Sequence, residues 1–297
     1  MAASPGRPAG FAFRALKKPE EFRHAEELQR DAPGEEGAPS VPAPLLRTVQ
    51  DNGGLVLGAF ADIYLAGVTV SSIGWDGTTL YHQVLATVVR PEYRSHHLGT
   101  RLMAFERDEV LRLGLGEVRW EFDPLHRAAA SLSVRRLGAR PDRYLADYYG
   151  QAGDAGSGRD ETDRLHVRWE LSAAEVERRV GGELPRAEDD LARHARSSPI
   201  VQTEPGDSGL RLPTSVAEPT GPSASLEIPF DLASIRSHEP KSVRRWRHAV
   251  RDAFRAAFDL GYRVDDFAVV ARDHERRAFY FLAPPPEGGT EPSPAPR

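Results

Sequence analysis

The stretch VVRPEYRSHHLGTRLM, residues 88–103, decides the fold. It starts with a β-branched run that ends at Val89, is interrupted by Pro91, and passes through Gly99 into a helical pattern of apolar residues. A strand–loop–helix junction of this kind points several backbone N–H groups at one spot, and the helix dipole adds positive potential there. Gly99 permits a close approach to the backbone, and Arg94 can add a charge-assisted hydrogen bond. The junction therefore predicts a site for a pyrophosphate or another anion.

The sequence on both sides of this junction predicts a mixed α/β domain. Apolar periodicity and turn residues predict, in chain order, a strand at 11–17, helices at 19–30 and 45–50, strands at 55–60, 65–72 and 81–89, a helix at 99–113, a strand at 117–122 and a helix at 123–137 capped by Asp123. This order, β–α–α–β–β–β–α–β–α, is typical of a mixed sheet covered by helices. A further strand is expected at 163–171.

The rest of the chain predicts a smaller C-terminal extension. Its expected elements are a helix with a Ser172–Glu175 capping box, an irregular Pro-rich connector at 197–225, a helix at 240–261 and a hairpin of 262–271 with 277–283. The basic face of the 240–261 helix is expected to be solvated and paired with acidic neighbours, or to dock an anionic partner. The expected organisation is a disordered start at 1–10, a main domain at 11–171, a helix and connector at 172–225, an αββ extension at 226–283 and a disordered tail at 284–297.

Composition excludes several classes of protein. The chain has 297 residues and a formal net charge of −5, which argues against a nucleic-acid binder. It has no cysteine, which excludes disulfides, thiolate metal sites and cysteine nucleophiles. No apolar run reaches the ~18 residues of a membrane span, and the N-terminus lacks the apolar region of a signal peptide. We therefore expect a cytoplasmic protein with no nucleic-acid or membrane partner.

The junction resembles the acetyl-CoA-binding motif of the GNAT acyltransferase superfamily, which runs Val-x-Pro-x-x-Arg and then Gln/Arg-x-x-Gly-x-Gly/Ala. Val89, Pro91, Arg94 and Gly99 match this motif, and His97 replaces the earlier glycine. The resemblance covers about residues 11–150. The part WEFDPLHRAAASLSVRRLGARPDRYLADYYG, residues 120–150, is similar to a narrower branch of acyl-CoA N-acyltransferases with a C-terminal extension, some of which act on amino acids. The resemblance to the GNAT superfamily implies a GNAT-like fold with splayed central strands.

The resemblance also implies a function and a cosubstrate. The implied reaction moves an acetyl or succinyl-type group from CoA to the amine of a small molecule such as an amino acid, by direct attack on the thioester. The alternatives are a non-catalytic acyl-CoA-binding regulatory or scaffold protein and a protein N-acetyltransferase; a homodimer is also expected. The residues that the resemblance assigns to acetyl-CoA are Val88, Val89, Arg94, Ser95, His96, His97, Leu98, Gly99 and Thr100.

The acid and the base are indicated less directly. Members of the superfamily often use a Tyr four residues before the glycine that is here Gly138, and Val134 occupies that position. Tyr144 is the candidate acid, followed by Tyr148 and Tyr149, and His82 or Glu121 is the candidate base. His82 could instead be a packing residue, and Tyr144 an ordinary surface residue. No metal is expected, because the adjacent His96 and His97 lack a third ligand at ligand spacing.

Overall fold

The computed structural model describes residues 10–31, 40–150, 161–206, 208–272 and 275–284. The expected disordered ends lie outside these ranges, apart from Gly10 and Pro284. The chain divides into two compact units, each built from several segments. The first unit comprises Met1–Glu121, Arg135–Ala139 and Val167–Leu184, and the second comprises Phe122–Val134, Arg140–His166 and Pro185–Arg297.

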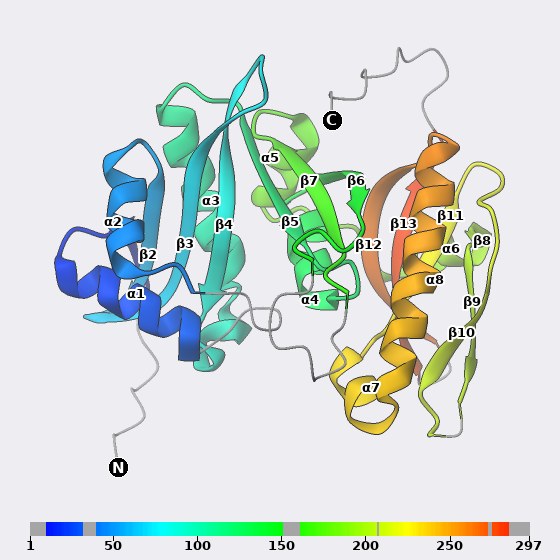
Figure 1. Cartoon of the computed structure of the whole chain (residues 1–297). Helices are drawn as coiled ribbons and strands as arrows, with labels where there is room; N and C mark the ends of the chain where they lie inside the picture. Colours follow the sequence, from blue (N-terminus) through cyan, green and yellow to red (C-terminus); the bar gives the residue numbers. More distant parts are fainter. Residues whose placement is uncertain (1–9, 32–39, 151–160, 207, 273–274, 285–297) are drawn as a thin grey trace. The chain divides into compact units, whose positions relative to one another are not determined.

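The first unit contains the elements predicted up to residue 122 (Figure 1). They are β1 (Ala12–Ala15), α1 (Pro19–Asp31), α2 (Ala43–Asp51), β2 (Leu55–Ala61), β3 (Tyr64–Trp75), β4 (Leu80–Val89), the 3-10 turn η1 (Pro91–His96), α3 (Leu98–Arg112) and β5 (Glu117–Phe122). The unit also holds most of β7 (Arg164–Glu170) and all of α5 (Ala174–Val180). The strand order of the large sheet is β1-β2-β3-β4-β5-β7-β6. The predicted element order is therefore confirmed.

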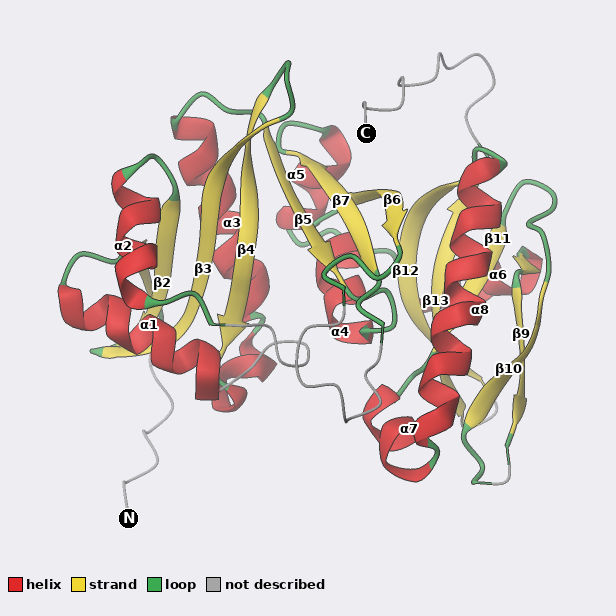
Figure 2. Cartoon of the chain, in the orientation of Figure 1, coloured by secondary structure: helices red, strands yellow, loops and turns green. Residues whose placement is uncertain are grey.

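Two hydrophobic clusters fix which helices cover which face of this sheet (Figure 2). On one face, Leu28 of α1 and Leu46 of α2 pack with Val68 and Val70 of β3, and all four are fully buried. On the other face, α3 packs against β2 and β3 through Leu102. Its close approach depends on a glycine, because a Cβ on Gly67 would lie 2.9 Å from Cδ1 of Leu102. The sheet thus has helices on both faces and its core on both sides.

The second unit is built around the C-terminal helix and hairpin. Its elements are α4 (Arg127–Ala130), most of the π-helical turn η2 (Ser131–Arg136), β6 (Arg140–Leu145), α6 (Ala187–Arg196), β8 (Ser198–Pro199), β9 (Val201–Pro205), β10 (Arg211–Val216), β11 (Ala224–Ile228), α7 (Leu232–His238), α8 (Pro240–Asp259), β12 (Arg263–Arg272) and β13 (Glu275–Ala283). The strand order of the smaller sheet is β12-β13-β11-β8. α8 buries Trp246, Val250 and Phe254 in this unit.

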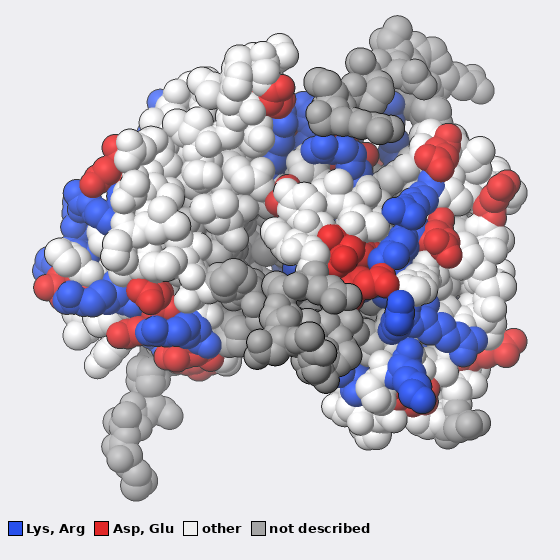
Figure 3. Space-filling model, viewed as in Figure 1, with Lys and Arg blue, Asp and Glu red and all other residues white. Residues whose placement is uncertain are grey.

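The outer face of α8 carries charges of both signs (Figure 3). Arg244 lies 3.5 Å from Glu161, and Arg251 lies 2.6 Å from Asp163. The expected pairing with acidic neighbours is therefore confirmed for these two side chains. The expectation that the whole basic face is solvated is wrong for Arg247, which is 2% exposed.

Three local predictions are wrong: the connector at 197–225, the capping box at Ser172 and the start of the helix at 123–137. The segment 197–225 is not an irregular connector, because β9 and β10 form an antiparallel pair within it. Its prolines are tolerated because Pro205 is the last residue of β9 and Pro213 adjoins a register shift in a two-stranded sheet. The helix after Ser172 has Ala173 at its N-cap and no side-chain cap, so the predicted capping box is absent there.

The helix predicted at 123–137 starts later than expected. It begins at Arg127, with His126 at the N-cap. Asp123 instead accepts a hydrogen bond from the amide of Leu125 at 2.8 Å and pairs with Arg247. The predicted role of Asp123 as the helix cap is therefore wrong, because an ion pair within the second unit holds its carboxylate.

Candidate active site at the β4–α3 junction

The two central strands β4 and β5 run parallel and separate after a short contact. Their residue pairs are His82 with Val118 and Gln83 with Arg119, at the start of both strands. β4 continues to Val89 while it remains paired with β3. Because alternate residues of a strand point their backbone groups to opposite edges, half of the peptide groups after Gln83 face the β5 side without a ladder partner there. The splayed strands expected from the resemblance are thus present.

A β-bulge lies where the strands separate. In the β3–β4 ladder, Val70 pairs with Ala86 and Ser71 pairs with Val84, so the ladder skips Leu85. An extra residue bends its strand and increases the local twist, which turns the C-terminal half of β4 away from β5. The Leu85 side chain is 47% exposed. Sequence analysis missed this residue, because LATVV has no glycine or proline to mark a bulge.

The loop after β4 leads into an uncapped helix N-terminus. His97 is the N-cap residue of α3 and makes no side-chain capping hydrogen bond. The first N–H groups of a helix lack partners within the helix, so those of Leu98, Gly99 and Thr100 depend on a side chain, water or a ligand. His97 has φ 53° and ψ 27°, the left-handed conformation that a glycine adopts most easily. Histidine is among the residues that tolerate this region, which explains how His97 replaces the family's glycine.

The other predicted cofactor residues lie along the same segment. Val88 and Val89 end β4 and pair with Val68 and Gly67 of β3. The guanidinium of the exposed Arg94 turns back over the strand end, and its Nε donates to the carbonyl of Val89 at 3.2 Å. Ser95 and His96 lie in η1.

The His96 ring does not extend into the loop. It lies 6.1 Å from the ring of Phe11 and 6.5 Å from that of Tyr93.

The candidate base His82 is fully buried on the α3 side of β4. Its exposed fraction is 0%, and its Nδ1 lies 3.0 Å from Oγ of Ser71. Burial lowers the pKa of His82 to about 4, so the ring is neutral at physiological pH. Glu121 lies on the opposite face of the sheet, where its Oε2 accepts a hydrogen bond from Gln83 at 2.8 Å.

A buried carboxyl that sequence analysis did not single out lies close to His82. Glu106 of α3 has an exposed fraction of 0%, and its Oε2 accepts a hydrogen bond from Thr69 at 2.9 Å. Burial raises the pKa of Glu106 to about 7, against the opposing effect of the Ser71 and Thr69 hydroxyls. The signal was present in the sequence, because Glu106 occupies the apolar stripe of the helix between Met103 and Val110.

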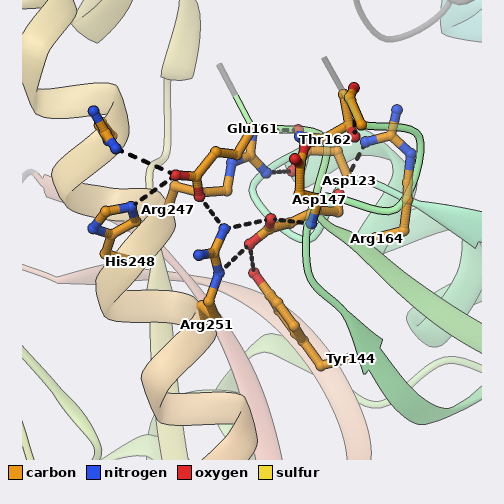
Figure 4. A network of polar contacts seen from close by, with 12 residues as sticks. Asp123, Tyr144, Asp147, Glu161, Thr162, Arg164, Arg247, His248 and Arg251 are labelled. Atoms are coloured by element: carbon orange, nitrogen blue, oxygen red, sulfur yellow. Dashed lines mark hydrogen bonds and ion pairs between the residues drawn. The ribbon is translucent and has the colours of Figure 1, made fainter. Parts of the chain in front are cut away.

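The candidate acid Tyr144 belongs to the second unit and is held in a polar network (Figure 4). Its hydroxyl donates to Asp163 at 2.7 Å, and Nε of Arg251 donates to the same carboxylate oxygen at 2.9 Å. Burial and the Asp163 carboxylate raise the pKa of Tyr144 above its usual range. Burial opposes ionisation of Asp163, but Arg251, the Asp147 amide and Tyr144 outweigh it and lower the pKa of this carboxyl.

The other two candidate acids, Tyr148 and Tyr149, also belong to the second unit. The rings of Tyr148 and Tyr149 contact each other with centroids 4.8 Å apart, and both side chains are exposed. Across the described ranges, no group of three or more His, Asp or Glu side chains could hold a metal ion. In the same ranges no helix is both long and apolar enough to cross a bilayer.

Comparison with known families agrees with this geometry. Residues 21–139 match the family described as the acetyltransferase (GNAT) family. These residues form a GNAT acetyltransferase domain. The match runs from α1 past η2 and contains the whole β4–η1–α3 junction. For residues 21–139, the predicted family, the mixed α/β fold and the assignment to the acyltransferase enzymes are therefore confirmed.

The solved structures that are similar to this chain include N-acetyltransferases. The ribosomal-protein-S18-alanine N-acetyltransferase of Escherichia coli is 18% identical and covers 55% of this chain and 96% of its own, with a TM-score of 0.45. Arabidopsis thaliana NAA60 in complex with acetyl-CoA is 15% identical and covers 54% and 99%, with a TM-score of 0.44. An N-acetyltransferase from Staphylococcus aureus Mu50 is 11% identical and covers 55% and 99%, with a TM-score of 0.44. A search of the curated proteins finds no match.

Proposed function

We propose that this protein transfers an acetyl or succinyl-type group from CoA to the amine of a small molecule such as an amino acid. The observation that carries the proposal is the separation of β4 from β5 after Gln83, next to the uncapped N-terminus of α3. The first feature leaves backbone groups along one edge of β4 for a ligand, and the second leaves N–H donors for an anion. A phosphorylated cosubstrate with amide groups along its length needs both.

The residues at the junction fit the two ends of such a cosubstrate. The amides of residues 95–100 and the Arg94 guanidinium would hold the phosphates, because both supply positive potential at one place. The edge of β4 that ends in Val88 and Val89 would bond the amides of the pantetheine arm. Acyl-CoA supplies the activated acyl group for the reaction.

The chain itself must deprotonate the acceptor amine and stabilise the charge that develops on the acyl oxygen. The backbone N–H of Leu85 is the candidate donor for that oxygen, because the β3–β4 ladder skips Leu85 at the point where β4 separates from β5. His82 is the candidate base, because its pairing with Val118 lies one residue before the point where β4 and β5 separate. Protonation of the leaving thiolate makes a smaller demand, since a thiol with a pKa of about 8.5 is already a fair leaving group.

The first experiment tests the cosubstrate. Thermal shift and calorimetry with acetyl-CoA, succinyl-CoA and longer acyl-CoA thioesters should give binding for at least one of them. Gly99→Val should weaken that binding about tenfold, or roughly 1.4 kcal/mol, by steric exclusion at the first turn of α3. Asp108→Val is the matched control, because Asp108 is exposed on the same helix and the change carries the same β-branched cost. Equal affinity in Gly99→Val and the parent protein would contradict the placement.

The second experiment tests the reaction. Release of free thiol from the bound thioester is measured with pools of amino acids, polyamines and peptide N-termini. Turnover with the amino acid pool supports the proposal. Turnover with peptides alone would make the protein a protein N-acetyltransferase, and tight binding without thiol release would make it a non-catalytic acyl-CoA-binding protein.

A further inference from the structure

Buried polar side chains form a chain between β4 and α3 in the first unit. His82 and Glu106 are its two ends, and both have an exposed fraction of 0%. Ser71 of β3 lies between them: its Oγ is 3.0 Å from Nδ1 of His82, and its hydroxyl is close enough to the Glu106 carboxyl to lower the pKa of that group. Thr69 donates to the other side of the network, 2.9 Å from Oε2 of Glu106. A histidine, a hydroxyl and a carboxyl thus lie next to one another inside the domain.

Each end of this series has an unsatisfied atom. Among the described residues, neither Nε2 of His82 nor Oε1 of Glu106 has a hydrogen-bond partner. A buried polar atom without a partner destabilises the folded state. Such atoms are uncommon in folded proteins, and each therefore needs an explanation. A passive packing role for His82 leaves this cost unexplained.

Within the described part of the chain, no other charged group sets the pKa of His82 or Glu106. The titratable residues on the surrounding elements are Tyr64 of β3, Tyr81 of β4, Glu92, Tyr93, Arg94 and His96 of η1, Arg101, Arg107, Asp108, Glu109 and Arg112 of α3, and Glu117, Arg119 and Glu121 of β5. None of them shifts the pKa of His82 or Glu106, which burial and the hydroxyls of Ser71 and Thr69 set. Arg119 lies over the Tyr81 ring and Arg107 donates to the Leu171 carbonyl.

We propose that Ser71 and Glu106 complete a proton relay behind His82, and that Glu106 is the group that finally holds the proton of the acceptor amine. The inference rests on the proposed function. The ammonium proton passes to Nε2 of His82, directly or through one water. The Nδ1 proton passes to Oγ of Ser71, and the Ser71 hydroxyl proton passes to the Glu106 carboxylate. The amine keeps its electron pair, His82 and Ser71 end neutral, and one N–H bond is exchanged for one O–H bond.

The relay resolves a difficulty with His82 as a base acting alone. Burial disfavours an imidazolium at this position, so a proton stored on the ring would be costly. Burial also disfavours the Glu106 carboxylate, so protonation of that carboxyl removes a buried charge. Transfer through Ser71 therefore ends in the neutral form that the interior favours at both ends. His82 stands beside the point where β4 leaves β5, where an amine placed for acyl transfer would be nearest.

Infrared difference titration tests the end of the relay without turnover. The parent protein should show the C=O band of a buried carboxylic acid that disappears as the pH rises through about 7. Glu106→Gln should lack this band. Thr69→Val should move its titration to higher pH, because the Thr69 hydroxyl lowers the pKa of Glu106. A band that persists in Glu106→Gln would overturn the assignment.

Steady-state kinetics test the relay itself, with an amino acid acceptor found in the thiol-release screen. In the parent protein kcat should rise with pH, with an inflection near the pKa of Glu106, because the relay needs the ionised carboxylate. Ser71→Ala and Glu106→Gln should each lower kcat at least tenfold, abolish that inflection and leave acyl-CoA affinity unchanged. Ser71→Thr keeps the hydroxyl and should restore both rate and inflection. Thr87→Val is the matched control, because Thr87 bonds Thr69 at 3.0 Å and contacts no relay atom.

The outcomes separate the two proposals. An unchanged pH profile in Glu106→Gln would overturn the relay and leave the proposed function intact. A parent protein that binds acyl-CoA and releases no thiol with any amine would overturn the proposed function and the relay with it. Loss of acyl-CoA binding in Ser71→Ala, with no recovery in Ser71→Thr, would assign Ser71 a structural role and overturn the relay.

Discussion

Asp123 and Arg247 form a two-point ion pair across 124 positions of sequence. Nη1 of Arg247 lies 2.5 Å from one carboxylate oxygen and Nη2 lies 2.7 Å from the other. Arg247 is 2% exposed and Asp123 is 6% exposed, so water screens neither charge. The pair joins the loop that follows β5 to the middle of α8 within the second unit. The ion pair with Arg247 holds the Asp123 carboxylate, so Asp123 does not cap the following helix as its sequence predicted.

Removal of one partner should therefore be far more costly than removal of both. Arg247→Ala removes the guanidinium that balances the buried charge of the Asp123 carboxylate, so we expect a loss of roughly 3–5 kcal/mol in the free energy of unfolding. The double variant Asp123→Leu/Arg247→Met, which fills the same space with apolar groups, should lose less than Arg247→Ala. The control is Arg245→Ala, at an exposed position of the same helix. Urea unfolding that gives equal losses for Arg245→Ala and Arg247→Ala would contradict the prediction.

Local periodicity was sufficient to predict most of the first unit. The apolar stripe through Leu102 and Val110 predicted α3, and the alternation of Val118, Trp120 and Phe122 predicted β5 with its observed ends. Both patterns reflect burial against one face, so they can be read without knowledge of the partner. The same reasoning predicted α8 from its buried residues.

Features that depend on distant partners could not be predicted in this way. The contact of Asp123 with Arg247 joins segments that no periodicity relates, and the local Asp-Pro pattern favoured a cap instead. The bulge at Leu85 is a property of the register between β3 and β4, and the β4 sequence alone does not specify it. Strand β6 was missed because RPDRYL is polar and contains Pro141. In each of these cases tertiary pairing outweighed local preference.

The left-handed conformation of His97 predicts an unusual order of substitutions. His97→Gly should retain or increase stability, because glycine adopts a positive φ without steric cost. His97→Val should lower the free energy of unfolding by at least about 1 kcal/mol, because a β-branched residue is an outlier in this region. Acyl-CoA affinity should follow the same order, since this residue starts the turn into α3. The measurements are thermal unfolding and calorimetry, and greater stability in His97→Val than in His97→Gly would refute the backbone argument.

Tyr144→Phe should affect stability more than turnover. The Tyr144 hydroxyl is committed to Asp163, and its removal leaves a buried carboxylate with one fewer donor. We expect a loss of about 1–3 kcal/mol in the free energy of unfolding, as for a hydrogen bond to a charged group. The value of kcat/KM should fall by at most about tenfold, because a thiolate leaves readily near neutral pH. The control is Tyr148→Phe at an exposed position. Abolished turnover with intact acyl-CoA binding would make Tyr144 the acid.

The buried Glu106 should make the stability of the protein fall as the pH rises. Its pKa is about 7 in the folded protein and 4.5 in the unfolded chain, so the folded state binds the proton more tightly. Its effect on stability is therefore complete below pH 4.5 and is lost between pH 4.5 and pH 7. The difference between these two pKa values corresponds to roughly 3 kcal/mol of stability.

Glu106→Gln should remove this dependence, because the amide has nearly the shape of the protonated acid and does not titrate. We expect the variant and the parent to have similar free energies of unfolding near pH 5, and the variant to be the more stable above pH 8. The matched control is Glu109→Gln on the same helix, where the side chain is 25% exposed and pairs with Arg112. Urea unfolding from pH 5 to pH 9 provides the measurement. Parallel curves for the parent and Glu106→Gln would show that this carboxyl is ionised throughout, and the interior would then have to hold its charge by contacts other than the Thr69 and Ser71 hydroxyls.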